Sequence, residues 1–528
     1  MKIRILFFLI FASLVFAQEG TKSSVELPTF VITGKDIVEL PIVNKMDVLI
    51  TPKLPESSFN PVFKPIRFSR KEFKPAYKEI TVPEYIFDPQ LSGAISLNFG
   101  NIITPAFEGD IMYLTKELAV NGRIGGYNSK AYVLNSEKFV TRSYVKIQYY
   151  PFESTGMFSD VHLNSTLNTH YKKFRLFGSM DPARERNLNS YDIGFSLDKG
   201  KDTPYLLNLN AENRSTIIKE EGFNGNLWDL SANFGVHFTN FRADLAGKIL
   251  SNKETQNNAV LRNNMQGIEA TISGIISGIF ELKGGVNYSK NSTESKISPV
   301  SSMKFRLTDN FELGADYGGG YRLNTNSGLI RLNNYLNVFS LCDLSHYRDK
   351  HISAFAKFEE EKIICAVLTA GQFSDLNLGL IDYQPSTAKF VVDKKDAETK
   401  FVRLELTGYM GPFGSINTVT NYSSVKLKDG TDFPGFAPVD ITFDYRLELF
   451  RGFETSLSAS YKSPVRYSSI IQDKLDGHLL FSAGTRYSFS DNFIFNLFIS
   501  NLSDQKYYNW YNYPEPGRSI EAGLIFNW

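Results

Sequence analysis

The sequence predicts an all-β protein, a large antiparallel transmembrane β-barrel preceded by a proline-rich, mostly extended N-terminal segment. Three observations support this prediction: segments of about ten residues alternate apolar and polar side chains, connections between them alternate between short and long, and the chain ends on an apolar alternating strand. An alternating terminal strand also fits a soluble β-sandwich, so the last strand alone does not decide the fold class.

The last strand begins near Ile520, and every second side chain from there is apolar. Because successive side chains of a strand point to opposite faces, these residues form one face that lipid can cover. Only helices and closed barrels satisfy their backbone hydrogen bonds inside lipid, so a closed barrel is expected. The face consists of Ile520, Ala522, Leu524, Phe526 and Trp528.

The same alternation predicts strands over residues 441–450, 453–461 and 479–489. Short connections are predicted at 308–310, 410–412, 450–452 and 490–492, and longer polar ones at 291–298, 386–398, 427–435, 462–473 and 504–515. Outer-membrane barrels place short turns in the periplasm and long loops outside. About twenty-two to twenty-five candidate strands are present, and a periplasmic N-terminus requires an even number. The run Gly318-Gly319-Gly320 is interpreted as relieving crowding or allowing a bend near a loop.

The chain before the barrel divides into two parts. Residues 1–17 resemble a secretory signal, with Lys2 and Arg4 ahead of an apolar run, and residues 18–90 hold nine prolines. Proline blocks ladder pairing and disrupts helices, so this segment is expected to be extended in the periplasm. The predicted domains are therefore a signal peptide (1–17), a periplasmic segment (18–90) and the barrel (91–528).

A family resemblance rests on the last hairpin. Asn501-Leu502-Ser503-Asp504, then Tyr507-Tyr508, then the YPEPGR run of residues 513–518 resemble the closing hairpin of TonB-dependent receptor barrels. The resemblance implies twenty-two strands, with twenty-four as the alternative, and an outer-membrane location. It also implies that the barrel assembly machinery recognises the terminal strand through Leu524, Phe526 and Trp528.

A second, shorter match lies after the signal and resembles the region of these receptors that pairs with the periplasmic protein TonB. It comprises Leu27, Pro28, Phe30, Val31, Ile32, Thr33 and Gly34. Its short β-branched core favours addition as a strand to a partner. TonB or another periplasmic protein is therefore the expected partner of residues 18–90, with outer-membrane lipid around the barrel.

Family receptors next carry a plug domain that fills the barrel, and no such pattern is found between Gly34 and Ser92. A barrel of this width leaves a lumen that side chains alone do not fill. One functional hypothesis is transport or uptake of an unidentified solute, with the pore closed by the N-terminal segment or a partner. The other is a structural or docking barrel that anchors a periplasmic or surface partner.

Composition argues against several other functions. The formal charge of +1 gives no global attraction for nucleic acid. The six histidines show no metal-ligand spacing and no serine lies in a nucleophile motif, so neither an enzyme, a cofactor nor a metal site is predicted. Cys342 and Cys365 are expected on strands that are not neighbours, hence unpaired, although a disulfide stays open.

Lumen-facing charges are the better functional candidates. Cross-strand pairing alone explains mixed charges in a water-filled lumen, and the functional alternative is a ladder that grips a polypeptide or selects a solute. The candidates are Lys304, Arg306, Glu312, Asp316, Arg403, Glu405, Asp444, Arg446 and Glu448.

Overall fold

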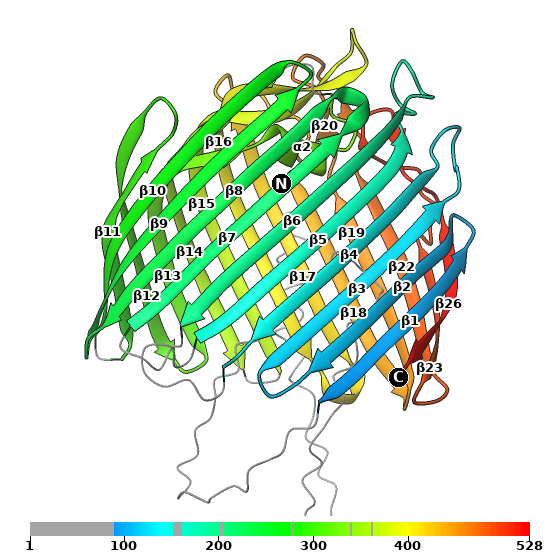
Figure 1. Cartoon of the computed structure of the whole chain (residues 1–528), viewed down its shortest axis with the longest axis horizontal. Helices are drawn as coiled ribbons and strands as arrows, with labels where there is room; N and C mark the ends of the chain where they lie inside the picture. Colours follow the sequence, from blue (N-terminus) through cyan, green and yellow to red (C-terminus); the bar gives the residue numbers. More distant parts are fainter. Residues whose placement is uncertain (1–88, 152–160, 200–204, 277, 338–340, 361–362) are drawn as a thin grey trace, which may run out of the picture. The chain divides into compact units, whose positions relative to one another are not determined.

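The computed structural model describes residues 89–151, 161–199, 205–276, 278–337, 341–360 and 363–528. Twenty-two strands form a single antiparallel sheet that closes on itself (Figure 1). Each strand pairs with the next along the chain, β19 with β22 and β23 with β26, and β26 returns to β1. The predicted barrel and the expected number of twenty-two strands are confirmed.

The barrel strands have the following bounds: β1 (Gln90–Gly100), β2 (Ile103–Leu114), β3 (Leu118–Ser129), β4 (Lys138–Tyr149), β5 (Val161–Arg175), β6 (Glu185–Lys199), β7 (Tyr205–Ile218), β8 (Phe223–His237), β9 (Phe241–Gln256), β10 (Ala259–Ile276), β11 (Phe280–Lys290), β12 (Ser295–Thr308), β13 (Phe311–Asn324), β14 (Leu344–Glu360), β15 (Ile364–Gln384), β16 (Lys389–Tyr409), β17 (Ser415–Leu427), β18 (Val439–Phe450), β19 (Phe453–Lys462), β22 (His478–Ser488), β23 (Phe493–Ser500) and β26 (Ser519–Asn527). The connections hold η2 (Lys219–Glu221), α2 (Asn326–Leu332), η3 (Gly411–Phe413) and the two short pairs β20 (Val465–Arg466) with β21 (Lys474–Leu475) and β24 (Tyr508–Trp510) with β25 (Tyr513–Pro514).

The outer surface of the barrel is apolar, as the alternation predicts. On the last strand Ile520, Leu524 and Phe526 are exposed, whereas Ile525 between them is buried against Ala94. Such exposed apolar side chains recur around the ring, for example Ile249 on β9 and Leu457 on β19. In water this surface would cause aggregation, so lipid must cover it, and the protein is an outer-membrane barrel. Among the described residues, no helix is long and apolar enough to cross a membrane.

The two edges of the barrel differ. At the edge where the chain ends, the connections 238–240, 309–310, 451–452 and 489–492 are short. Aromatic rings pack beside them, Phe450 against Phe453, and Phe526 against both Phe493 and Trp528. Aromatic girdles mark membrane interfaces, and short turns face the periplasm. The opposite, outer edge carries the longer loops 325–343, 428–438, 463–477 and 501–518.

Two predicted loops are wrong. The connection predicted at 291–298 is only residues 291–294, and that predicted at 386–398 is residues 385–388, because the flanking strands continue. Beyond the bilayer both faces of a strand can be polar, so alternation no longer distinguishes ladder from loop. The β15–β16 hairpin continues to pair up to Gln384 and Lys389.

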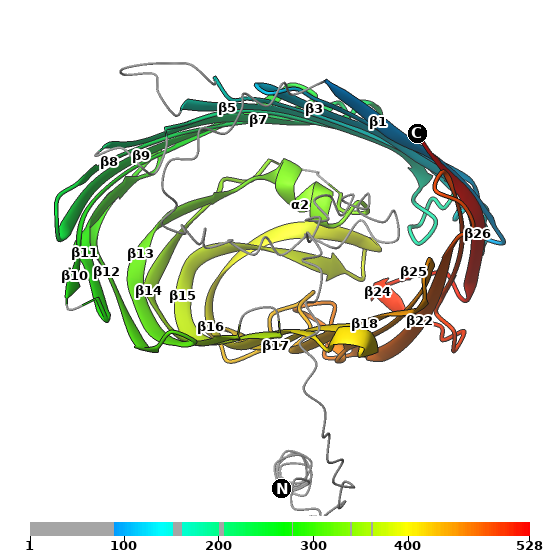
Figure 2. The ribbon, with the colours of Figure 1, turned by 90° about the horizontal axis from the view of Figure 1, so that it is seen from below.

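The outer ends of β13 to β16 bend into the lumen (Figure 2). Three neighbouring strands carry a bulge at the same height, between Gly318 and Gly320, between Asp349 and Ile352, and between Asp375 and Leu378. A bulge kinks its strand, and bulges side by side make a common bend line. The predicted bend at the glycine run is therefore confirmed. A Cβ on Gly319 would lie 2.9 Å from the carbonyl oxygen of Arg348, so glycine permits this close approach.

The cysteines lie toward opposite edges and form no disulfide. Cys365 is on β15, as expected of a strand residue, but Cys342 lies in the connection before β14.

Candidate functional site

A loop between β13 and β14 lies inside the barrel. We call its described residues, 325–337 and 341–343, the cap loop. It starts with α2, whose N-cap Thr325 accepts a hydrogen bond from the Gly328 amide at 2.9 Å. Thr at this position satisfies an amide that the helix leaves unpaired, which explains why the helix begins there. The inward bend of β13 delivers the loop to the lumen (Figure 2).

A buried carboxylate fixes the start of the helix. Glu254 on β9 is fully buried and accepts hydrogen bonds from the backbone amides of Asn326, at 3.3 Å, and Ser327, at 2.8 Å. It also accepts one from the Asn326 side-chain amide at 2.6 Å. Amides at a helix start carry partial positive charge, so an acidic side chain there stabilises the loop on the barrel wall.

A guanidinium fixes the other end of the helix. Arg331 donates to Thr216 Oγ1 at 2.8 Å and to the Ser215 carbonyl at 2.7 Å on β7, and forms an ion pair with Asp192 of β6 at 2.6 Å. Charge-assisted hydrogen bonds of this kind are among the stronger polar contacts in proteins. They tie the cap loop to a wall that is far from β13 along the ring.

A second arginine holds the loop beyond the helix. Arg186 of β6 is 1% exposed, pairs with Glu221, and donates to the carbonyl oxygens of Asn334 and Leu336, the latter at 3.0 Å. A buried guanidinium is out of reach of water, so protein oxygen atoms such as these three must accept its hydrogen bonds. We refer to Arg186, Glu254 and Arg331 as the latch residues.

Near the latch, apolar side chains form a core that crosses the outer part of the lumen. We call this core the cap cluster; its twelve buried members are Phe174, Leu176, Leu188, Ile218, Phe223, Ile330, Leu336, Ile381, Tyr383, Phe390, Tyr467 and Tyr513. They come from β5 to β8, from β15 and β16, and from four outer loops. Strands β6 and β16 are about half the ring apart, so a core that contains both must span the lumen.

Two stacked tyrosine pairs join members of the cap cluster to residues packed against it. Tyr335 stacks on Tyr513 with ring centroids 3.6 Å apart, and Tyr467 on Tyr511 at 4.1 Å. Burial raises the pKa of Tyr335 and Tyr513 far above the usual range, and raises the pKa of Tyr467 to about 12. The phenols therefore stay neutral at physiological pH, which suits a buried aromatic core.

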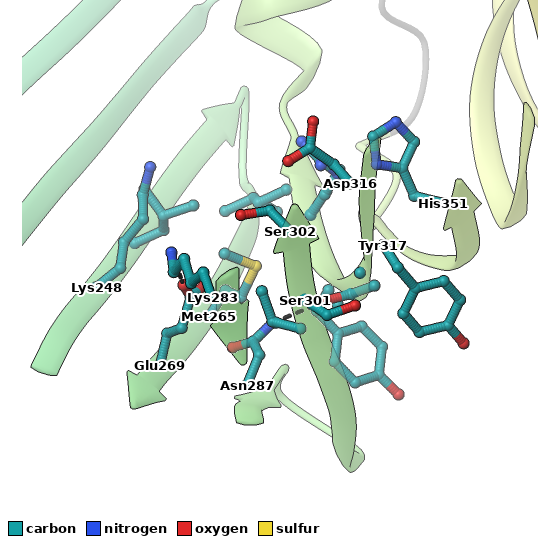
Figure 3. Close-up of a pocket in the computed structure, with 18 of the residues that line it drawn as sticks. Lys248, Met265, Glu269, Lys283, Asn287, Ser301, Ser302, Asp316, Tyr317 and His351 are labelled. Atoms are coloured by element: carbon teal, nitrogen blue, oxygen red, sulfur yellow. Dashed lines mark hydrogen bonds and ion pairs between the residues drawn. The ribbon is translucent and has the colours of Figure 1, made fainter. Parts of the chain in front are cut away.

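A cavity of about 560 Å³ lies under the bent part of β13, on the lumen side of β9 to β12 (Figure 3). On one side Lys283 pairs with Glu269 at 3.1 Å; on the other, Asp316 of β13 and His351 of β14 lie near each other. The Asn287 amide donates to the Gly319 carbonyl at 2.9 Å and so fixes the bend. The cavity offers both signs of charge to a polar solute.

The predicted charged residues are spread along the wall rather than gathered at one site. Only Asp316 lines the cavity. Lys304 lies 3.8 Å from Glu281, and Arg403 pairs with Glu405 on its own strand at 2.5 Å. Glu448 accepts from the Gly452 amide in a turn. Arg306 and Glu312 pair in register on β12 and β13, and Asp444 and Arg446 lie on β18.

The other predicted sites divide by location. The segment Leu27–Gly34, residues 18–88 and the signal at 1–17 lie outside the described residues.

At the C-terminus the Trp528 amide donates to the Gly93 carbonyl at 3.0 Å, and the Gly93 amide donates to the Trp528 carbonyl at 3.1 Å. The last residue thus closes the ring. The sequence analysis did not identify the latch residues, because each of their contacts between the cap loop and the wall joins positions more than seventy residues apart.

No family model and no curated protein matches this chain by sequence. Solved structures match by fold. The FrpB iron transporter from Neisseria meningitidis (F5-1 variant, apoprotein form) is 10% identical over 83% of this chain and 81% of that chain, with a TM-score of 0.66. The copper transporter OprC is 12% identical over 85% and 81%, with a TM-score of 0.61. The siderophore receptor PiuA from Acinetobacter baumannii is 10% identical over 84% and 82%, with a TM-score of 0.59.

These likenesses confirm the expected resemblance to TonB-dependent receptor barrels at the level of the fold. The described residues hold no group of three or more His, Cys, Asp or Glu side chains placed to bind a metal ion. The candidate functional site is the outer part of the lumen, made of the cap loop, the latch residues and the cavity beside them.

Proposed function

We propose that the protein carries a solute across the outer membrane through a lumen that the cap loop opens and closes. The observation that carries this proposal is the charged latch: Arg331, Glu254 and Arg186 hold the cap loop on the wall formed by β6, β7 and β9. A twenty-two-stranded barrel leaves a lumen that must be closed by something. Matched structures that are named as iron and copper transporters and as a siderophore receptor support transport.

The latch residues suit a loop that leaves the wall and returns to the same position. Apolar packing of similar volume is often at least as stabilising as a buried ion pair, so buried charges are weak stabilisers. Their directional hydrogen bonds, however, restrict the loop to one position. The cavity below the latch, with Lys283, Glu269 and Asp316, offers a polar path for the solute.

The N-terminal segment completes the proposal. We infer that residues 18–90 contact a periplasmic partner, which the family resemblance suggests is TonB, through Leu27–Gly34, and that residues 59–87 cover the periplasmic mouth. The absence of a plug pattern between Gly34 and Ser92 supports closure by the cap loop instead of a plug. The alternative is a docking barrel, in which the lumen stays closed permanently.

A reversible crosslink separates these functions. An ideal Cβ on Gly225 of β8 would lie 2.8 Å from Ser327 Cβ of α2, slightly closer than the 3.5–4.5 Å of disulfides, so a small shift allows a bond. Gly225→Cys with Ser327→Cys, in a background of Cys342→Ser and Cys365→Ser, should pin the cap loop when oxidised. Solute flux into liposomes should be low when oxidised and recover with dithiothreitol.

Each single-cysteine variant in the same background serves as the matched control and should not respond to the reductant. Equal flux through the oxidised and reduced double variant would contradict gating by the cap loop. In that case the docking function becomes the better explanation.

A further inference from the structure

A second, smaller cavity of about 110 Å³ lies between the cap loop and the wall. Strands β5 and β6 form its wall side, and Arg331 and Asn334 close it from the cap loop. Its size suits one small polar group rather than a chain. The lining residues include Asn168, His170, Lys172, Ser190, Asp192 and Arg331.

The charges around this cavity are mainly positive. Within the described part of the chain, the Lys172 ammonium has no ion pair, and the charged side chain that acts on it is another cation, Lys138. The charged groups that act on His170 are also cations, namely Lys172, Arg142 and Arg331. Unpaired positive charge in a partly buried cavity is costly unless an anion is present.

The carboxylates nearby are already engaged. Asp192, the one carboxylate among the lining residues, pairs with Arg331 at 2.6 Å. Glu108 lies 3.7 Å from Arg142 and 3.3 Å from Arg123. Among the described residues, Lys172 therefore keeps a donor group without an acceptor, and Ser190, which also lines the cavity, is buried.

We propose that this cavity binds a small oxyanion, the phosphate or carboxylate group of a solute in the lumen. Lys172 contributes the main charge, and His170 and Ser190 contribute hydrogen bonds. Lipid headgroups are excluded as the source, because the cavity lies on the lumen side of β5 and β6, beside the cap loop. Lys173, the next residue, faces away and pairs with Glu185 at 3.0 Å.

The site touches the latch. Arg331 lines the cavity and also holds the cap loop, so a bound anion competes with Asp192 for the guanidinium. An anionic solute that reaches the cavity would thereby weaken the latch. This last step rests on the proposed function, whereas binding does not.

Calorimetric titration of inorganic phosphate into the full-length protein, folded in detergent at constant ionic strength, tests binding directly. Wild type should bind one phosphate saturably, and Lys172→Met should bind about tenfold or more weakly, as expected for losing a charged hydrogen-bond donor. Lys172→Arg should retain most of the affinity, and the matched control Lys173→Met should bind as wild type does. Acetate in place of phosphate tests whether a carboxylate group suffices.

Heat-modifiable migration of each variant on gels establishes that its barrel has folded, and His170→Gln, which should weaken phosphate binding, replaces Lys172→Met if that variant does not fold. An absent saturable heat in wild type, or an equal loss in the Lys172→Met and Lys173→Met variants, overturns the site. If phosphate binds through Lys172 but leaves the current through reconstituted protein unchanged, the binding site stands and its action on the latch is refuted.

Discussion

Replacing Arg331 with methionine should open the lumen, since it removes the contact that holds α2 on the wall. Arg331 makes three hydrogen bonds, at 2.6, 2.7 and 2.8 Å, to Asp192, Ser215 and Thr216. Methionine keeps the length and apolar stem of the side chain and a good helix propensity, so α2 itself should survive. The change therefore tests the latch rather than the fold.

The magnitude follows from exposure. Hydrogen bonds to charged groups contribute about 1.5–3 kcal/mol each when buried. The Arg331 and Asp192 side chains are 26% and 30% exposed, so solvent screens part of that energy. A total of about 2–3 kcal/mol is reasonable for the latch contact, which shifts the ratio of open to closed cap loop by about 30- to 150-fold.

Single-channel recording in planar bilayers measures this ratio. Arg331→Met should show longer or more frequent open periods than wild type. Arg403→Met is the matched control, because Arg403 forms its ion pair within β16 and takes no part in the cap loop. Deleting residues 18–88 in both backgrounds separates closure at the two mouths: the deletion alone should leave the cap loop closed, and the combination should give the largest steady current. Identical records for Arg331→Met and Arg403→Met would refute the latch.

Two further predictions concern the barrel. Removing residues 526–528 should sharply lower assembly, because Trp528 exchanges two backbone hydrogen bonds with Gly93. Gly93→Val should act similarly, since a Cβ there would lie 2.2 Å from the Trp528 ring. The amount of heat-modifiable barrel in isolated outer membranes measures both effects, and unchanged assembly would show that ring closure does not need this contact. Leu457→Lys, on the exposed outer face, should lower the free energy of unfolding by about 2–4 kcal/mol if residue 457 lies near the bilayer midplane. Ser456→Lys, on the opposite face of the same strand, should change it very little. Equal losses in a folding titration would mean that the two faces are assigned wrongly.

The barrel could be predicted from sequence because its signal is local. Alternation along β18, β19 and β22 reports which face meets lipid, and the two turns at 451–452 and 489–492 are read from a few residues. The closing hairpin was recognisable for the same reason. Its last strand lies beside β1, but the pairing follows from the need to close the ring.

The position of the cap loop could not be predicted, since its contacts with the wall join residues that are distant in sequence. Arg331 and Asp192 are 139 residues apart, and Glu254 and Asn326 are 72 apart. Polar residues on the lumen face resemble ordinary water-facing side chains, so nothing marked these as a set. Of the three bulges, only the one at the glycine run is marked in the sequence. The bulge of β15 contains Asn377, whose φ is 61°, but the sequence holds many asparagines and nothing distinguishes this one.

The energetics decide which part of the cap opens. Twelve apolar or aromatic side chains are buried in the cap cluster, and at about 1.5–3 kcal/mol for each, separating them would cost about 20–35 kcal/mol, more than the whole stability of many domains. Lifting α2 alone breaks the Arg331 and Glu254 contacts and exposes one fully buried apolar side chain, Ile330. That cost is only several kcal/mol, which ligand binding can supply. Opening should therefore be confined to α2 while the tyrosine stacks stay intact. A single disulfide in the Gly225→Cys, Ser327→Cys double variant should be enough to prevent this opening.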